Sequence, residues 1–404
     1  MDMLARKLGI SPVEFRKINA IQPGDTTPTQ QMMDPNTGDL KGCIDSVAAN
    51  LNWNEGDRIQ ISKHRVRAKG IACLWKAPAM PTNTDAGAII TFNEDGTLNL
   101  TTGVVEIGQG THTGLAQIVA ERFRVDPEQV HVVYEVRTER APHDWATAAS
   151  RSLFMAGRAA LEAAEDAIAQ LKRIASIPLS CPPEDLEVAQ GRIFLRDNPT
   201  VGLSLAEVAL GYQYPNGTAV GGQVIGRGRY IARHLTHLDP ETGKGDPALE
   251  WTLGAEGVEV EVNLKDGSYR VLKAVCAMDV GKVINPALAR GQIVGAMAMA
   301  LGFASRESFQ FDERERVLNG NLRDFKLLRY GEEPEYRVEF LETPQRDGPY
   351  GLRGLGEQGV IGIPAALANA LSRGLGVELT ELPLTPERVW RAMENQKTQK
   401  EASP

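Results

Sequence analysis

Cysteines are few in this 404-residue chain, and their spacing excludes several kinds of metal centre. Cys43, Cys73, Cys181 and Cys276 lie far apart and form no CxxC pair. Zinc sites and iron–sulfur clusters usually take closely spaced cysteines as ligands. We therefore expect structural thiols, no metal held by the protein's own side chains, and any iron–sulfur centre on another chain.

Runs of like charge are also missing. The 44 basic and 52 acidic side chains give a formal net charge of -8 at pH 7. A surface that binds nucleic acid is normally rich in lysine and arginine, so this balance argues against a nucleic-acid partner. The hydrophobic content of 42% is ordinary for a globular protein, and the length supplies core for two or three domains.

Long uninterrupted apolar runs are absent from the sequence as well. Residues 208–226 are long enough to span a membrane, but polar residues, proline and glycines interrupt them. Residues 291–305 are more apolar, yet they are shorter than the roughly 18 residues that a span needs. The N-terminal segment MDMLARKLGISP has no apolar core of signal-peptide length. We therefore expect no membrane span and a cytoplasmic location.

Composition divides the chain into a connector and a larger domain. Residues 1–80 are predicted to form a helical connector without a compact core of its own, in which Ser11 caps a helix that begins at Pro12. Residues 81–404 are predicted to form the main domain, and residues 396–404 are expected to be a flexible tail.

The order of predicted elements after residue 81 occurs twice, roughly in residues 86–250 and 251–395. In each half, two strands flank a tight turn (NEDG at 93–96, KDG at 265–267), and a loop with Gly-Gln and a helix follow. Strands are predicted at 88–92, 97–105, 130–136, 257–263, 269–277 and 336–341, and helices at 41–51, 111–124, 151–175 and 364–371. We predict an α/β fold of the α+β type, with two related strand-hairpin and helix units and one shared cleft. The loops expected to converge there are 106–113, 144–152, 279–292 and 351–359.

The most unusual stretch is residues 348–369, GPYGLRGLGEQGVIGIPAALAN. Its closely spaced glycines leave a loop with few side chains, which lets the backbone approach a bulky ligand. Glu357 is the single carboxylate within the stretch. Near a helix start and partly out of water, it is a candidate general base with a raised pKa. A plain turn is the alternative interpretation.

The segment GLGEQG, residues 354–359, also fits the G-x-G-x-x-G dinucleotide pattern, and Glu378 follows about 20 residues later. No strand is predicted to run directly into the first glycine, however. Glu357 would also repel a pyrophosphate, and too little chain follows Glu378 to complete a doubly wound half-domain. We therefore reject this interpretation.

A second loop has the composition of an anion site. Thr147–Ser152, TAASRS, places hydroxyl groups and the guanidinium of Arg151 at a predicted helix start, where unpaired amides bind anions. Simple capping of the helix by Ser150 is an equally good alternative. Gln109 and Gln292 each follow a glycine, and an amide can bind the polar edge of a ring, although an ordinary surface glutamine is the simpler interpretation.

Residues 138–146, TERAPHDWA, precede that loop and are candidates for contact with a substrate. Within them, His143, Asp144 and Trp145 carry the side chains of interest, and Arg353 could add positive charge to the same place. A solvated polar residue is an equally good interpretation of each.

Six blocks of sequence occur in one order, and they carry a resemblance to a known family. In this order they resemble the second half of the molybdenum-binding subunit of the xanthine dehydrogenase/aldehyde oxidase family, over nearly the whole chain. The blocks are DMLARKLG (2–9) with residues 12–19, EIGQGTHT (106–113), TAASRS (147–152), residues 279–281 with Asn285 and Pro286, Gly291 with Gln292, and residues 348–369.

The resemblance implies a cofactor and a reaction. Residues 81–404 would form the second molybdopterin-binding domain, and the cofactor would be a molybdopterin dinucleotide, in bacteria usually the cytosine form, whose pterin holds the molybdenum. Glu357 would be the catalytic base in hydroxylation of an N-heteroaromatic or aldehyde carbon with oxygen from water. The implied cofactor contacts are Gly108, Gln109, Gly110, Thr147, Ala148, Ala149, Ser150, Arg151, Ser152 and Gln292.

The resemblance also implies partners. The family's molybdenum subunit normally begins with a small α/β domain and a first cofactor-binding half, and neither is in this sequence. The first half is therefore expected on a separate chain, although a piece of a longer chain would look the same. The other expected partners are a 2Fe-2S subunit, an FAD subunit that receives the electrons, and a small-molecule substrate; a dimer of the whole assembly is a further expectation. Met299 also departs from the family, which commonly has glutamine there.

Two other functions fit the residues less well. A structural subunit could retain the fold without the metal, although the retained Glu357 and the GQG and TAASRS loops argue against it. A nucleotide-dependent dehydrogenase is the weaker alternative. Metal analysis of the assembled complex separates the first alternative from the enzyme, and NAD binding by this chain would support the second.

Overall fold

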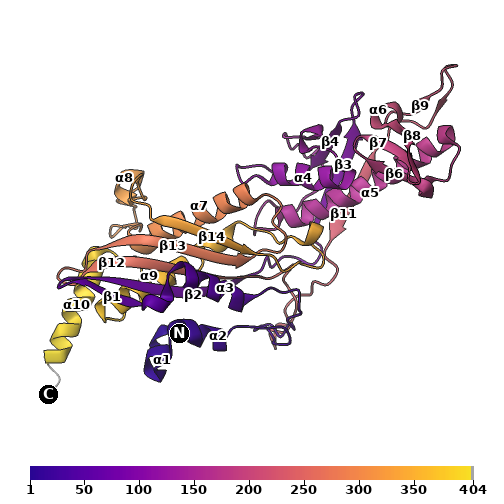
Figure 1. Ribbon diagram of the computed structural model, residues 1–404. Helices are drawn as coiled ribbons and strands as arrows, with labels where there is room; N and C mark the ends of the chain where they lie inside the picture. The colour runs from indigo at the N-terminus through magenta and orange to yellow at the C-terminus, as the bar shows by residue number, and fades with distance from the viewer. Residues whose placement is uncertain (402–404) are drawn as a thin grey trace.

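The structure is a computed structural model that describes residues 1–401, with side chains described as far as residue 398. Two helix-covered sheets lie toward the two ends of an elongated molecule, at the upper right and the lower left of Figure 1. We call them the first unit and the second unit.

The first unit is a four-stranded sheet in the order β11-β3-β4-β5, in which only β4 and β5 are parallel. Two helices, α4 and α5, pack on it, and the alanine-rich face of α5 lies directly on β11. A Cβ atom on Gly228 of β11 would stand 2.0 Å from the carbonyl oxygen of Ala159, so only glycine permits this packing. The bounds are β3 (Asp85–Phe92), β4 (Leu98–Thr102), α4 (Thr111–Phe123), β5 (Val130–Val132), α5 (Ser152–Leu179) and β11 (Gly226–Ile231).

The second unit is a five-stranded sheet in the order β1-β2-β12-β13-β14, in which only β13 and β14 are parallel. Helix α9 lies directly on β2, where a Cβ atom on Gly70 would stand 2.1 Å from the carbonyl oxygen of Ala366. The bounds are β1 (Arg58–Ser62), β2 (Arg65–Lys76), β12 (Thr252–Asn263), β13 (Tyr269–Asp279), α7 (Pro286–Ser305), β14 (Glu335–Leu341) and α9 (Ile363–Leu375).

The two units repeat one arrangement, which confirms the predicted fold class. In each, a hairpin (β3-β4 or β12-β13) is followed by a helix, a strand parallel to the second strand of the hairpin (β5 or β14) and a further helix. The strand that pairs with the other side of the hairpin comes from a different part of the chain in each unit. In the first unit this strand, β11, follows the other elements, and in the second unit this strand, β2, precedes them. The tight turn predicted at 93–96 connects the two strands of the first hairpin, and the one predicted at 265–267 connects the two strands of the second.

The prediction of a helical connector over residues 1–80 is wrong for its second part. Helices α1 (Asp2–Leu8), α2 (Pro12–Ile18) and α3 (Leu40–Asn50) are present, but β1 and β2 belong to the second sheet. Strand β2 pairs with β12 along its whole length. Its lysine and arginine residues give the segment a mixed, basic composition, so the sequence does not indicate a strand there.

The first part of the connector also contributes to a core. Buried side chains of α3, including Ile44 and Val47, pack with Leu253, Ala255 and Val275 of the second sheet. Residues of α7 and α9 pack with another set of its side chains in a separate cluster. Helices therefore cover this sheet from two sides.

The other elements lie at the periphery. A three-stranded sheet beyond α5, which the sequence analysis did not predict, is built from β6 to β8. Helix α10 extends to Glu401, so residues 396–401 of the expected flexible tail are helical, and residues 402–404 lie outside the described residues. The remaining bounds are η1 (Trp53–Glu55), η2 (Pro127–Gln129), η3 (Pro183–Asp185), β6 (Leu186–Ala189), β7 (Arg192–Leu195), β8 (Asn198–Ser204), α6 (Leu205–Val208), β9 (Tyr212–Gln213), β10 (Ala219–Val220), α8 (Leu322–Phe325), η4 (Pro349–Gly351), η5 (Glu357–Val360) and α10 (Pro386–Glu401).

Helix α7 is longer than the apolar segment 291–305, because Asn285 caps it and Pro286 begins it. Among the described residues, it is the one helix long and apolar enough to cross a membrane by length and composition. Part of α7 is buried against α9 and η5, as in the core helix of a globular unit, which passes the same test.

Candidate active site

Loops from both units surround one cavity of about 600 Å³. The four loops that the sequence analysis expected to converge all contribute to it. Ten of the predicted site residues line the cavity: Gln109, Gly110, Thr147, Ala148, Ala149, Ser150, Ser152, Gln292, Arg353 and Glu357. Within the described part of the chain, no three histidine, cysteine, aspartate or glutamate side chains are grouped closely enough to hold a metal ion.

Two of these loops interlock. The carbonyl oxygen of Ser150 lies so close to Gly354 that a Cβ atom there would stand 1.5 Å from it. Ala149 and Ser150 both have positive φ angles, 58° and 59°, which are unfavourable for residues other than glycine and are often found at functional sites. The glycine at position 354 is therefore required by the close approach of the 147–152 loop.

The hydroxyls of this loop do not cap α5, which has no side-chain cap. Ser150 Oγ instead accepts a hydrogen bond from the backbone amide of Glu357 at 3.1 Å. Thr147 Oγ1 accepts one from the amide of Val105 at 2.9 Å. The proposed capping role is thus wrong, because both hydroxyls join neighbouring loops around the cavity.

Glu357 lines the cavity with a side chain that is 57% exposed. Its Oε2 atom accepts a hydrogen bond from Ser150 Oγ at 3.0 Å and lies 2.7 Å from Lys76 Nζ. Partial burial raises the pKa of Glu357, but the hydrogen bond and charge of Lys76, with the bond from Ser150, outweigh it, so the pKa lies below its ordinary value. The prediction of a raised pKa is therefore wrong, and Glu357 is an anion at neutral pH.

Lys76 is the main site residue that the sequence analysis missed. It ends β2 opposite Thr252, its side chain is only 14% exposed, and its ammonium group also donates to the carbonyl oxygen of Ala149. One cation thus holds both Glu357 and the strained loop. No local pattern in the sequence predicts this contact, because the position of Lys76 depends on the pairing of β2 with β12.

A buried glutamate and a buried glutamine form hydrogen bonds with the backbone of the 351–359 loop. Glu250 Oε1 accepts a hydrogen bond from the amide of Gly354 at 2.7 Å, and full burial raises the pKa of Glu250 to about 8. Gln358 Nε2 donates to the carbonyl oxygen of Gly354 at 2.8 Å, and its Oε1 accepts from the amide of Gly356 at 2.8 Å. The backbone of the loop that carries Glu357 is therefore held in place by two buried side chains.

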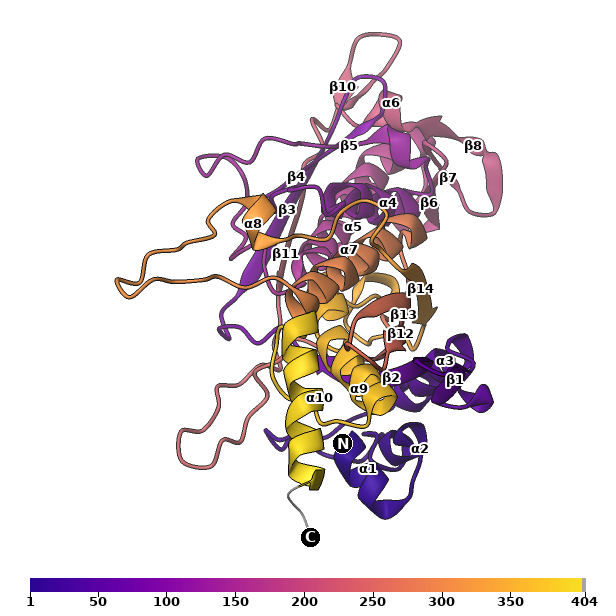
Figure 2. The same cartoon turned by 90° about the vertical axis from the view of Figure 1, so that its left-hand side faces the viewer.

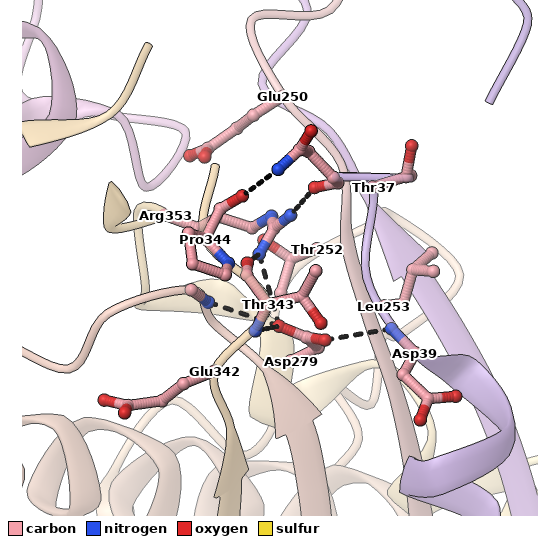
Figure 3. Close-up of polar contacts among 12 residues, drawn as sticks. Thr37, Asp39, Glu250, Thr252, Leu253, Asp279, Glu342, Thr343, Pro344 and Arg353 are labelled. Atoms are coloured by element: carbon pink, nitrogen blue, oxygen red, sulfur yellow. Dashed lines mark hydrogen bonds and ion pairs between the residues drawn. The ribbon is translucent and has the colours of Figure 1, made fainter. Parts of the chain in front are cut away.

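Arg353 does not offer a free charge to a substrate. Figure 3 shows its guanidinium facing Asp279, and Nη1 lies 3.2 Å from Asp279 Oδ1. Nη1 also donates to the carbonyl oxygen of Thr343 at 2.7 Å, and Nη2 donates to that of Asn36. Both charged groups are fully buried, so this ion pair is structural and the guanidinium is not solvated. Arg353 is still among the residues that line the cavity, and its contact with a substrate stays a prediction.

Arg151 and Asp144 form a similar buried pair. Arg151 Nη2 lies 2.7 Å from Asp144 Oδ1, both side chains are buried, and the exposed ring of Trp145 covers the guanidinium. The predicted phosphate contact of Arg151 and substrate contact of Asp144 are therefore wrong. His143 lies outside the cavity lining, with its Nδ1 atom 2.7 Å from Asp85 Oδ1.

The amides at the start of α4 already bind a carboxylate of the chain itself. Glu106 accepts hydrogen bonds from the amides of Gly108, Gly110 and His112, each at 2.9 Å. Burial raises the pKa of Glu106, but these three bonds outweigh it and the pKa is lowered. An acid just before the glycines was a visible signal that the sequence analysis did not use.

The predicted contacts of this loop are only partly present. The side-chain amide of Gln109 bonds to the backbone of its own loop, accepting from Ile107 at 2.7 Å and donating to Val105 at 2.9 Å. Gly108 is exposed and is not among the residues that line the cavity. Gln292, on α7, does line it.

Comparison with known proteins identifies the family of this chain. Residues 46–334 match the family model of the molybdopterin cofactor-binding domain. The chain is 30% identical, over 398 residues, to the putative xanthine dehydrogenase molybdenum-binding subunit XdhA of Escherichia coli (strain K12), a match that covers 96% of this chain and 50% of that protein. It is 27% identical to the aldehyde oxidoreductase of Megalodesulfovibrio gigas, covering 97% of this chain and 40% of that protein.

Among solved structures, quinoline 2-oxidoreductase from Pseudomonas putida 86 superimposes with a TM-score of 0.80 at 24% identity, covering 97% of this chain and 50% of that one. At this identity the match establishes a shared fold. The chain spans about half the length of the curated relatives that it matches. It therefore belongs to the molybdopterin cofactor-binding domain family, and it is similar to half of the molybdenum-binding subunits of xanthine dehydrogenase and aldehyde oxidoreductase type.

Proposed function

We propose that this chain is the half of a molybdenum-binding unit that supplies the general base, Glu357, for hydroxylation of an N-heteroaromatic or aldehyde carbon with oxygen derived from water. The observation that carries the proposal is the position of Glu357 in the cavity, where Ser150 and Lys76 hold its carboxylate. The names of relatives that act on quinoline, xanthine and aldehydes support the substrate class.

The cavity fits a molybdopterin cofactor. Gly291 and Gly295 of α7 line it, and a Cβ atom on either would meet nothing within 4 Å, so the wall is open to a flat ring system. Gln292 on α7, with Thr147 and Ser152 on the facing loop and α5, adds polar residues to the cavity lining. When bound, the cofactor supplies the molybdenum centre that carries out the oxidation. Its cytosine dinucleotide form remains part of the proposal.

The residues of this chain have separate tasks in the proposed reaction. Glu357 accepts a proton at its carboxylate, and Lys76 keeps that carboxylate ionised and oriented. A lowered pKa makes Glu357 available at neutral pH but a weaker base. Ser150 bonds to Glu357 and belongs to the strained 147–152 loop, so the position of the Glu357 carboxylate depends on the conformation of that loop. The first half of the unit and the 2Fe-2S and FAD subunits would come from outside this sequence.

The test is a comparison of variants in the complex assembled with its partner chains. Glu357→Gln should retain molybdenum at the level of the unchanged protein and lose hydroxylation about 100-fold or more, because general-base catalysis contributes at least that much. Glu94→Gln, at an exposed position in the β3–β4 turn, is the matched control and should retain both. Full activity of Glu357→Gln would remove the proposed base, and a complex without molybdenum would favour a structural role.

A further inference from the structure

Exposed apolar side chains are concentrated in one projecting segment, residues 306–334, which we call the arm. Phe309 and Phe311 are each 59% exposed, Leu318 is 62% and Leu322 is 71% exposed, and the ring of Tyr330 is fully exposed. Figure 2 shows the arm, labelled by α8, extending to the left away from both sheets. Monomeric proteins rarely expose such apolar groups together unless another molecule covers them.

The arm is an ordered element. The ring of Phe309 lies 4.9 Å from that of Phe325, between centroids, and the short helix α8 is capped by Asn321. Asn319 is buried, and its side chain bonds to the amide of Gln310 and the carbonyl oxygen of Ser308, each at 2.8 Å. The exposed side chains are therefore held in a defined arrangement.

The apolar surface continues along α7 to the cavity. Gly291, Gly295, Met299 and Phe303 recur at intervals of four residues, and all four are exposed, so they lie on one face of the helix. The first three line the cavity, and Phe303 leads toward the arm. A partner that packs on this face would thus also close the side of the cavity that α7 forms.

We propose that the arm, with Met299 and Phe303, is the docking surface for the complementary half of the molybdenum-binding unit. The chain aligns over 96% of its length with only 50% of its relative, so a comparable length of relative has no counterpart here. That half must also reach the cavity to complete it. The inference rests on the proposed half-unit role, but it does not depend on the chemistry of Glu357.

The charges of the arm favour a protein partner over a membrane. Its tip carries Asp312, Glu313 and Glu315 beside Arg314 and Arg316, a mixture of signs around an apolar centre. Protein interfaces commonly have an apolar centre with a polar rim, whereas helices that bind membrane surfaces are usually rich in lysine and arginine.

The experiment measures binding between this full chain and the complementary half, produced as a separate polypeptide. The double variant Leu322→Asp/Tyr330→Asp places charges at the two most exposed apolar positions of the arm. It should weaken binding about tenfold or more. The control Leu8→Asp/Met32→Asp alters exposed apolar residues far from the arm and should bind as the unchanged chain does.

Unchanged binding by the arm variant would overturn the inference. If the arm variant binds the complementary half normally but no longer self-associates, the arm binds a second copy and the inference is refuted. If it binds that half normally but no longer binds phosphatidylcholine vesicles, the arm binds a membrane and the inference is refuted as well. Hydrogen exchange of the unchanged chain gives an answer free of folding effects: the arm and α7 should gain protection when the complementary half is added, and no gain there refutes the proposal. Glu357→Gln should bind normally, so failure of catalysis and failure of docking are distinguishable.

Discussion

The fully buried carboxyl group of Glu250 should make the stability of this chain depend on pH. Burial raises its pKa from 4.5 to about 8, so the folded chain retains a proton that the unfolded chain releases. Between these values the unfolded chain binds fewer protons than the folded chain, and stability must fall as pH rises. At about 1.4 kcal/mol per pH unit, the full loss is ~5 kcal/mol.

Glu250→Gln removes this titration but keeps an oxygen that can accept the hydrogen bond from the amide of Gly354. The variant should therefore match the unchanged chain near pH 4.5 and become more stable than it by up to ~5 kcal/mol near pH 8. Urea unfolding followed by circular dichroism at a series of pH values measures the difference. A difference in free energy of unfolding that stays constant between these pH values would refute the argument.

Three further substitutions follow from contacts around the cavity. Lys76→Met removes the cation that lowers the pKa of Glu357, so the acidic limb of the pH–rate profile of the assembled complex should move to higher pH. Arg353→Met leaves the buried carboxylate of Asp279 unpaired and should reduce the free energy of unfolding by about 3–5 kcal/mol in urea titrations. Gly354→Ala should destabilise the chain by about 1–3 kcal/mol, because its Cβ atom has no space beside the 147–152 loop.

Each substitution has a matched control elsewhere in the chain. Lys63→Met, at an exposed position, should leave the pH profile unchanged. Arg316→Met breaks an exposed ion pair and should cost less than about 1 kcal/mol. Gly291→Ala adds a Cβ atom that meets nothing within 4 Å and should not destabilise α7. Equal effects in variant and control would contradict the structural explanation in each case.

Local chemistry made part of this fold predictable. The turns at 93–96 and 265–267 lie between alternating strands, so both hairpins could be placed from sequence. Strand β2 could not, because its arginine and lysine residues interrupt the apolar pattern. Its long-range pairing with β12 places the strand inside the sheet, where five consecutive residues, 68–72, are buried.

The candidate site was predictable to a similar extent. Glycine-rich loops marked the wall of the cavity, and Glu357 stood out as a single acid among glycines. The sequence could not show where a guanidinium points, and both Arg151 and Arg353 turn inward to buried acids. Lys76 and Glu250 reach the site through strand pairing and burial, which leave no local pattern.

The origin of strand β2 has a consequence for how the chain folds during synthesis. The second sheet takes β1 and β2 from before the first unit and β12 to β14 from after it, so the first unit is an insertion within the second. As the chain emerges from the ribosome, the first unit can close while β2 still lacks β12. The apolar face of β2 therefore stays unpaired until the whole first unit has been synthesised. During that time the unpaired strand is a site where chaperones could bind the nascent chain or where it could aggregate.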